Sequence, residues 1–193
     1  GDFAAAMAWG RRVRADLAPI DGVRRFTALG VDVFLGTGRF VAPDAVAVDG
    51  AQLAFRRAVI ATGARAAVPP VPGLADVAYH TNETIFALDR RPAHLVVLGG
   101  GPIGCELAQA FARLGTRVTL LDRGARLLAR EEPEASAVVE RALARDGVAV
   151  WHGAELQRVT PRGGSGGAEA TLHVRVADRV GDRDVALDTD ALL

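Results

Sequence analysis

The chain has 193 residues, half of them hydrophobic, which is enough apolar material for a packed core and excludes intrinsic disorder. Its 23 basic and 23 acidic side chains cancel, so the charge balance indicates neither a nucleic acid nor an anionic membrane as partner. A single cysteine, Cys105, excludes an internal disulfide and a cysteine-based zinc site, and the four histidines offer no close ligand pair, so we expect no metal site. No apolar run is long enough for a membrane span and no leader pattern opens the chain, which favours a cytoplasmic location.

The first part of the chain predicts a helix followed by short strands. Apolar residues recur at helical spacing from Phe3 to Ile20, where Pro19 disturbs the pattern. Short apolar runs separated by turn residues then predict an antiparallel meander that ends in a more buried strand. These runs cover residues 31–35, 39–41, 46–48, 53–55 and 59–60.

The second part predicts alternating strands and helices. Three prolines make residues 66–74 an extended linker, after which Thr81 or Asn82 caps a short helix that ends at Leu88. From His94, strands alternate with helices, which is typical of a parallel sheet with crossover helices. We expect strands at 95–98, 117–121, 148–151, 155–160, 170–176 and 184–187, and helices at 103–114 and 134–145. Residues 190–193 resemble the start of another buried strand, so we expect the chain to be a truncated piece.

The strongest motif is LVVLGGGPIGCELAQAFARLGTRVTLLD, residues 95–122. Gly99, Gly101 and Gly104 form a G-x-G-x-x-G pattern directly after an apolar strand and at the start of a helix, and Asp122 ends the next strand. Gly99 permits a tight turn, Gly101 lets the backbone approach a pyrophosphate, and Gly104 lets helix and strand pack closely. The amide groups and the dipole at the start of the helix favour phosphate. The motif therefore predicts a nicotinamide-dinucleotide-binding βαβ unit.

Other residues of this helix have simpler interpretations. Ile103, Leu107, Phe111 and Leu114 lie at helical spacing and are expected to bury against the sheet. Cys105 is interpreted as a small buried residue without a redox role.

The chain resembles the pyridine nucleotide-disulfide oxidoreductases, a family that includes dihydrolipoamide dehydrogenase, glutathione reductase and mercuric reductase. The resemblance rests on the A-T-G segment at 61–63, the proline-rich crossing through 72–73 and the glycine motif, and the phrase ELAQAFARLG at 106–115 is closest to the mercuric-reductase-like branch. It implies a Rossmann-like α/β fold of the FAD/NAD(P)-binding type. Residues 1–92 would be the second half of an FAD-binding domain, and residues 93–193 a nearly complete NAD(P)H-binding domain.

The resemblance also implies roles for individual residues. Glu106 would face the nicotinamide carboxamide, whereas Pro102 replaces the gating tyrosine of many members, so no gating ring is expected. No catalytic residue is expected in this piece. The implied FAD contacts are Ala61, Thr62 and Gly63, and the implied NAD(P)H contacts are Gly99, Gly100, Gly101, Ile103, Gly104, Glu106, Asp122, Arg123 and Arg126.

Cofactor preference depends on the residues that follow the second strand of the βαβ unit. Asp122 is placed to accept hydrogen bonds from the adenosine ribose hydroxyls and would repel a 2′-phosphate. Arg123 and Arg126 could offset that repulsion if both turned inward. Because the acidic residue sits at the strand end itself, we expect NADH to be favoured over NADPH.

In the parent protein implied by the resemblance, a homodimer, hydride passes from NAD(P)H to FAD and on to a disulfide or similar acceptor. Its flavin-binding glycine motif, paired redox cysteines and C-terminal dimer domain are not in this sequence, so we expect this chain alone to be inactive and to bind little FAD. Two alternatives stay open. One is a flavoprotein NAD(P)H reductase that uses no disulfide, and the other is a dinucleotide-binding module without catalysis. The final electron acceptor is undetermined.

Overall fold

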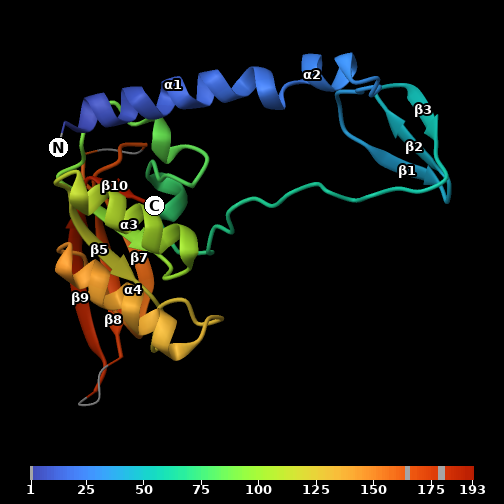
Figure 1. The fold of residues 1–193 in the computed structure, drawn as a ribbon. Coiled ribbons are helices and arrows are strands. Elements are labelled where there is room, and N and C mark those ends of the chain that lie inside the picture. The colour runs from blue at the N-terminus through green and yellow to red at the C-terminus, as the bar shows by residue number, and fades with distance from the viewer. Residues whose placement is uncertain (1, 164–165, 178–180) are drawn as a thin grey trace. The chain divides into compact units, whose positions relative to one another are not determined.

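The computed structural model describes residues 2–163, 166–177 and 181–193. Contacts divide the chain into two compact units (Figure 1). One unit comprises the residues up to 10 together with 66–193, and the other comprises residues 11–65.

The smaller unit contains helices and a three-stranded sheet. Its elements are the later part of α1 (Phe3–Asp21), α2 (Val23–Ala28), β1 (Arg39–Ala42), β2 (Ala45–Val48) and β3 (Ala51–Ala54). The strands pair antiparallel in the order β1-β2-β3, which confirms the predicted meander. The strand expected at 31–35 is wrong, because these residues are exposed and pair with no strand in the described chain.

The larger unit is built on a parallel sheet. Its strands are β4 (His94–Leu98), β5 (Arg117–Leu121), β6 (Ala149–Trp151) and β10 (Ala191–Leu192). They pair in the order β10-β4-β5-β6, and each pair is parallel. Two helices make the crossovers, α3 (Pro102–Arg113) and α4 (Pro133–Arg145). The predicted α/β fold class is therefore confirmed, with strand and helix limits within two residues of those expected.

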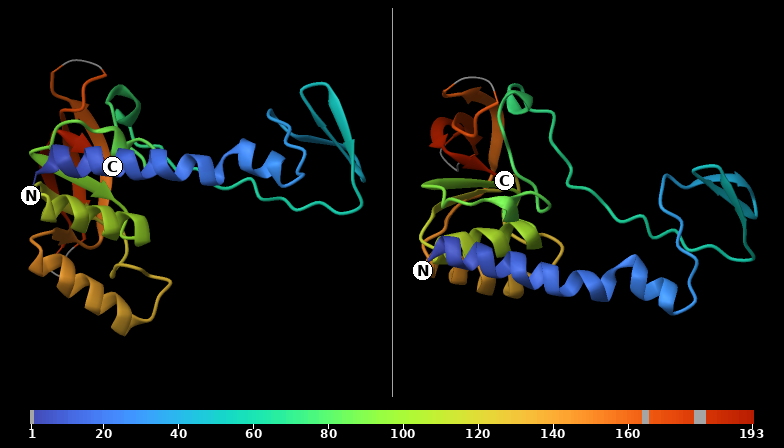
Figure 2. Two further views of the ribbon diagram at one scale, coloured as in Figure 1. Left: turned by 45° about the horizontal axis from the view of Figure 1, so that its top comes forward. Right: turned by 90° about the horizontal axis from the view of Figure 1, so that it is seen from above.

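Both faces of the parallel sheet are covered, and Figure 2 shows α3 and α4 on the same side of it. The other side carries an antiparallel sheet in the order β7-β8-β9. These strands are β7 (Ala154–Pro161), β8 (Ala170–Val176) and β9 (Arg183–Thr189). Side chains alternate accordingly, because Leu95 and Val97 pack toward the helices whereas Val96 packs toward β7–β9. A strand buried on both faces is typical of such three-layer folds.

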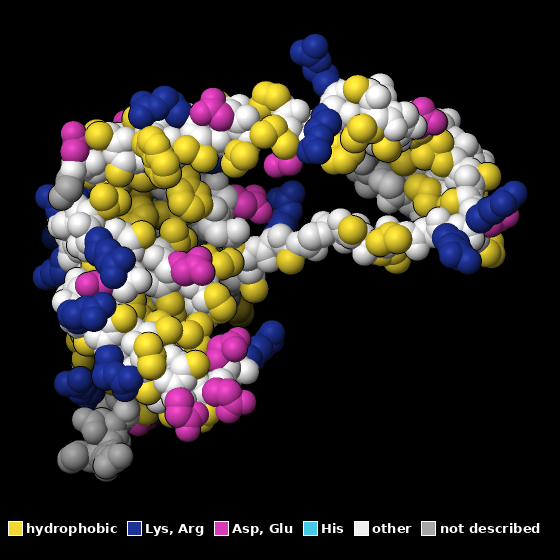
Figure 3. Space-filling model, in the orientation of Figure 1, with side chains coloured by type: hydrophobic (Ala, Val, Ile, Leu, Met, Phe, Trp, Pro, Cys, Tyr) yellow, Lys and Arg dark blue, Asp and Glu magenta, His cyan; other side chains and the backbone are white. Residues whose placement is uncertain are grey.

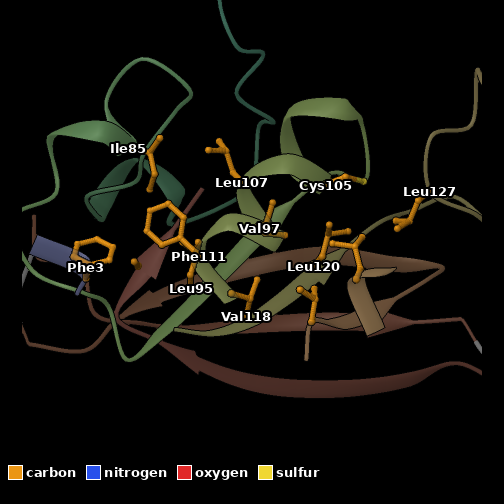
Figure 4. Packing of buried hydrophobic residues seen from close by; sticks show 14 of the residues in the cluster. Phe3, Ile85, Leu95, Val97, Cys105, Leu107, Phe111, Val118, Leu120 and Leu127 are labelled. Atoms are coloured by element: carbon orange, nitrogen blue, oxygen red, sulfur yellow. The ribbon is translucent and has the colours of Figure 1, made fainter. Parts of the chain in front are cut away.

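The helix-side core draws on segments far apart in the sequence (Figure 4). Phe3, from the start of α1, lies with its ring centroid 5.7 Å from that of Phe111 on α3. Ile85, from the short 3-10 helix η2 (Ile85–Ala87), is fully buried in the same cluster. Burying a large apolar side chain of this kind contributes about 1.5–3 kcal/mol, so residues before 93 help to stabilise the unit that contains the parallel sheet. The short 3-10 helix η1 (Leu74–Asp76) adds Leu74 to the cluster on the opposite face.

Helix α1 is apolar well beyond the residues that it buries. Phe3 and Met7 are buried, whereas Trp9 is 63% and Leu17 is 48% exposed. Figure 3 shows hydrophobic side chains on the surface of this helix and of the small β1–β3 unit. None of the helices in the described ranges has the length and the hydropathy needed to cross a membrane.

Candidate dinucleotide-binding site

The glycine motif forms the turn between β4 and α3, at the carboxyl edge of the parallel sheet. Gly99 has φ +105°, a conformation that favours glycine, and its N–H donates to the Leu121 carbonyl of the neighbouring strand. A Cβ on Gly104 would lie 2.0 Å from the Gly99 carbonyl oxygen, so only glycine lets the helix approach the turn so closely. Spacing alone predicted these two structural tasks.

The space in front of Gly101 is open. A Cβ built on Gly101 meets no atom within 4 Å, and Gly101 is the N-cap of α3 without a capping side chain. In the described part of the chain, the N–H groups of Gly101, Ile103 and Gly104 meet no protein acceptor. Pro102, which has no N–H, occupies the first helical position. Three unpaired amides and a helix N-terminus beside open space form a site that suits a phosphate-containing ligand.

Asp122 lies directly behind the turn. Its Oδ2 accepts a hydrogen bond from Gly100 N at 2.5 Å, and its Oδ1 accepts one from Gly124 N at 2.6 Å. Because β4 and β5 are parallel neighbours, their carboxyl ends bring Asp122 and the glycine turn together. The half-buried carboxylate therefore accepts hydrogen bonds from the backbone of the glycine turn and from the backbone of the loop that follows β5.

The two arginines after Asp122 have different surroundings. Arg123 is exposed, and no hydrogen bond from its side chain is found among the described residues. Arg126 is partly buried and donates from Nη1 to the Glu131 carbonyl and from Nη2 to the Ala129 carbonyl, both at 2.8 Å. In this structure the Arg126 guanidinium is thus bonded to its own loop rather than directed at a ligand.

The side chains of α3 differ in exposure along the helix. Glu106 is exposed on the first turns of α3. Ile103 is 52% exposed, so its predicted burial is wrong, although Leu107 and Phe111 are buried as expected. The reason is orientation, because two residues along a helix point in nearly opposite directions, and in the first turn of α3 it is Cys105 that joins the apolar cluster.

Cys105 packs inside, behind the glycine turn. Its Sγ lies 3.5 Å from the Gly100 carbonyl oxygen. Burial, with a smaller contribution from the nearby Asp122 carboxylate, raises the pKa of the thiol to about 11. The thiol is therefore protonated at neutral pH, in agreement with its interpretation as a small buried residue.

A buried polar cluster lies at the other end of the parallel sheet. His94 is 5% exposed, and its ring nitrogens lie 2.6 Å from the Asp188 carbonyl and 2.9 Å from Thr119 Oγ1. The Asp190 carboxylate accepts a hydrogen bond from the backbone N–H of His94 at 2.7 Å. Desolvation lowers the pKa of His94. This cluster joins β4, β5 and the chain leading to β10, and it could not be predicted from sequence because its members are far apart in the chain.

Residues 16–193 match the family described as pyridine nucleotide-disulphide oxidoreductase. The chain belongs to this family. Members of the family use FAD and NAD(P)H.

The pyridine nucleotide-disulphide oxidoreductases most similar in sequence include several mercuric reductases. That of Lysinibacillus sphaericus is 41% identical over 132 residues, which cover 68% of this chain and 24% of the relative. That of Streptomyces lividans is 46% identical over 101 residues, which cover 52% of this chain and 21% of the relative. Among solved structures, the HOCl-induced flavoprotein disulfide reductase RclA from Escherichia coli has 28% sequence identity and a TM-score of 0.78. The match covers 100% of this chain and 42% of the RclA chain. This chain therefore spans less than half the length of these relatives.

The A-T-G segment that contributes to the family resemblance is part of the smaller unit. Ala61, Thr62 and Gly63 are exposed and have no regular secondary structure. The preceding strand, predicted as buried at 59–60, is wrong, because Val59 is 90% and Ile60 is 73% exposed. An apolar strand needs a neighbour to satisfy its backbone, and no described strand pairs with this segment.

Proposed function

We propose that this chain is the NAD(P)H-binding portion of an FAD-dependent pyridine nucleotide-disulfide oxidoreductase. The observation that carries the proposal is the open space at Gly101, faced by three unpaired amides at the start of α3. In this proposal residues 93–193 form the nearly complete NAD(P)H domain and residues 1–92 the second half of an FAD domain. A cytoplasmic location and a homodimeric parent are parts of the same proposal.

The residues of the site fit a dinucleotide from its pyrophosphate outward. The amides of Gly101, Ile103 and Gly104 would donate to the pyrophosphate, a charge-assisted contact that the helix dipole strengthens. When bound, NAD(P)H supplies a hydride from its nicotinamide. By resemblance, Glu106 faces that end of the cofactor, and its exposure on the first turns of α3 leaves it free to do so.

The adenosine end would meet Asp122. A carboxylate offers about four lone-pair sites, and the two backbone hydrogen bonds use two of them, so ribose hydroxyls can still donate to it. The negative charge of Asp122 would repel a 2′-phosphate, and the Arg126 guanidinium already donates its hydrogen bonds to carbonyls of its own loop. Only Arg123 is left to offset the repulsion, and we propose that NADH is preferred over NADPH.

In the full-length parent, the acceptor would be a disulfide or a similar group. The relatives named above are mercuric reductases and a flavoprotein disulfide reductase, which supports a redox role for the parent without selecting its acceptor. The sequence contains a single cysteine, Cys105, and therefore no pair of redox cysteines.

Calorimetric titration of the 193-residue chain tests the proposal. We expect saturable binding of NADH, weaker binding of NADPH, and competition by ADP-ribose, which carries the pyrophosphate and the adenosine. Nicotinamide mononucleotide, which lacks both the pyrophosphate linkage and the adenosine, is the matched ligand control and should compete poorly. A chain that is folded by circular dichroism and binds neither reduced cofactor would refute the proposed function.

A further inference from the structure

The glycine turn is supported from behind by the loop of residues 122–131. The Asp122 carboxylate accepts a hydrogen bond from the N–H of Gly100, and the N–H of Leu128 donates to the Gly100 carbonyl at 2.8 Å. A Cβ on Gly100 would lie 2.5 Å from Cδ2 of Leu127, so this side chain lies directly against the turn. Both backbone groups of Gly100 are therefore held by the 122–131 loop.

The two halves of this loop are held in different ways. Leu127 is fully buried, and its carbonyl accepts a hydrogen bond from the buried Ser136 hydroxyl at 2.6 Å. Leu128 has φ +48°, a conformation that a leucine rarely adopts and that its surroundings must stabilise. Residues 129 and 130 are exposed and bury no apolar side chain.

Arg126 provides the support for this exposed half. Its guanidinium donates to the carbonyls of Ala129 and Glu131 at 2.8 Å, with a longer contact of 3.4 Å to the Leu128 carbonyl. Because the guanidinium is planar and rigid, one side chain fixes several carbonyls at once, which a lysine ammonium does less well. Charge-assisted hydrogen bonds of this kind are stronger than neutral ones.

We infer that Arg126 is a positioning residue for dinucleotide binding, which fixes the 122–131 loop and, through Leu128, the glycine turn without contacting the cofactor. The inference rests on the proposed function. The pyrophosphate is common to NADH and NADPH, so loss of Arg126 weakens both cofactors by the same factor. A direct ligand of the 2′-phosphate would instead affect NADPH alone.

The test compares Arg126→Ala, Arg126→Lys and Arg130→Ala in the 193-residue chain. Arg130 is the matched control, because it is an exposed arginine of the same loop. Calorimetry gives Kd for NADH and for NADPH, and hydrogen exchange without cofactor reports the Leu128 amide. We expect Arg126→Ala to raise both Kd values about tenfold with their ratio unchanged, and to speed exchange at Leu128. Arg126→Lys should recover part of the affinity, and Arg130→Ala should match wild type.

Three results would overturn the inference. The first is loss of NADPH binding alone in Arg126→Ala, which would make Arg126 a phosphate ligand. The second is unchanged Kd values with a lower melting temperature, which would make its role only structural. The third is unchanged exchange at Leu128, which would remove the link between Arg126 and the turn. A folded wild-type chain that binds neither cofactor would overturn the proposed function itself. The exchange measurement needs no cofactor, so it would still show whether Arg126 supports the turn at Leu128. If Arg126→Ala does not fold, Arg126→Lys decides through the same ratio of Kd values.

Discussion

Gly101→Ala should separate cofactor binding from folding. Gly101 has φ −75° and ψ 178°, which alanine adopts readily, and its Cβ would meet no protein atom within 4 Å. Alanine is a poorer N-cap than glycine, but it also restricts the unfolded chain. These two effects offset to within about 1 kcal/mol, so the melting temperature should change by at most about 2–4 °C.

Binding should change far more than stability. The added methyl group would occupy the space that a pyrophosphate needs in order to reach the amides of the turn. Losing one such hydrogen bond to a charged group costs about 1.5–3 kcal/mol, which raises Kd about tenfold to hundredfold. Calorimetric titration with NADH, beside a thermal melt of the same sample, measures both quantities.

Gly104→Ala is the contrasting variant. Its Cβ would lie 2.0 Å from the Gly99 carbonyl oxygen and 3.4 Å from Val97 Cγ1, so α3 must move away from the turn. Forcing a methyl group into a packed site costs about 1–3 kcal/mol, and we expect a melting temperature lower by several degrees. If Gly101→Ala binds NADH as tightly as wild type does, no pyrophosphate lies at this turn and the reasoning fails.

Three further predictions concern other parts of the chain. Burial lowers the pKa of His94 below its ordinary 6.5, so the unfolded chain binds more protons near that pH, and stability present above pH 6.5 is lost as the pH falls. Urea unfolding from about pH 8 to about pH 5 should show this loss, and an equally steep loss in His94→Gln would assign it to another group. The purified chain should be colourless, because Ala61–Gly63 are exposed and the flavin-binding glycine motif that the family resemblance implies is not in this sequence, and stoichiometric flavin absorption would contradict this. In the full-length parent, Glu106→Ala should slow reduction of the flavin by NAD(P)H but lower the melting temperature only slightly. The interaction of Glu106 with the helix dipole contributes only about 0.3–1 kcal/mol to stability. Unchanged reduction kinetics would mean that Glu106 interacts with the helix dipole and has no role at the nicotinamide.

The parallel sheet could be predicted because its signal is local. β4 and β5 are each an apolar run followed by a helical pattern and then by the next strand, and that alternation alone requires parallel crossovers. The runs at 31–35 and 59–60 have similar composition but form no strand. Strand propensity describes how well side chains pack against a neighbouring strand, and the local sequence does not say whether a neighbouring strand is present. These segments were therefore predicted wrongly for a reason that composition could not reveal.

Sequence could predict those parts of the candidate site in which the backbone conformation requires a particular residue type. The positions of Gly99 and Gly104 follow from their spacing, because each is required where a Cβ or an ordinary φ cannot be accommodated. The direction of Arg126 does not follow from spacing. A charged residue after a strand end can turn toward a ligand or toward nearby carbonyls, and that choice depends on the path of the loop, including the unusual φ of Leu128.

Asp122 shows how one side chain can serve both the turn and the ligand. Its carboxylate accepts from Gly100 N and Gly124 N, so a substitution there removes support from the turn as well as any contact to ribose. Asp122→Ala should therefore weaken both NADH and NADPH, whereas loss of the ribose contact alone would weaken NADH and relieve repulsion of the 2′-phosphate. Asp122→Asn is the sharper variant, because it removes the charge while one amide oxygen can still accept from Gly100 N. The amide NH2 cannot accept from Gly124 N, so a lower melting temperature is expected, but a smaller preference for NADH in Asp122→Asn would still assign the preference to the charge. Equal weakening of both cofactors would mean that Asp122 acts on the turn alone.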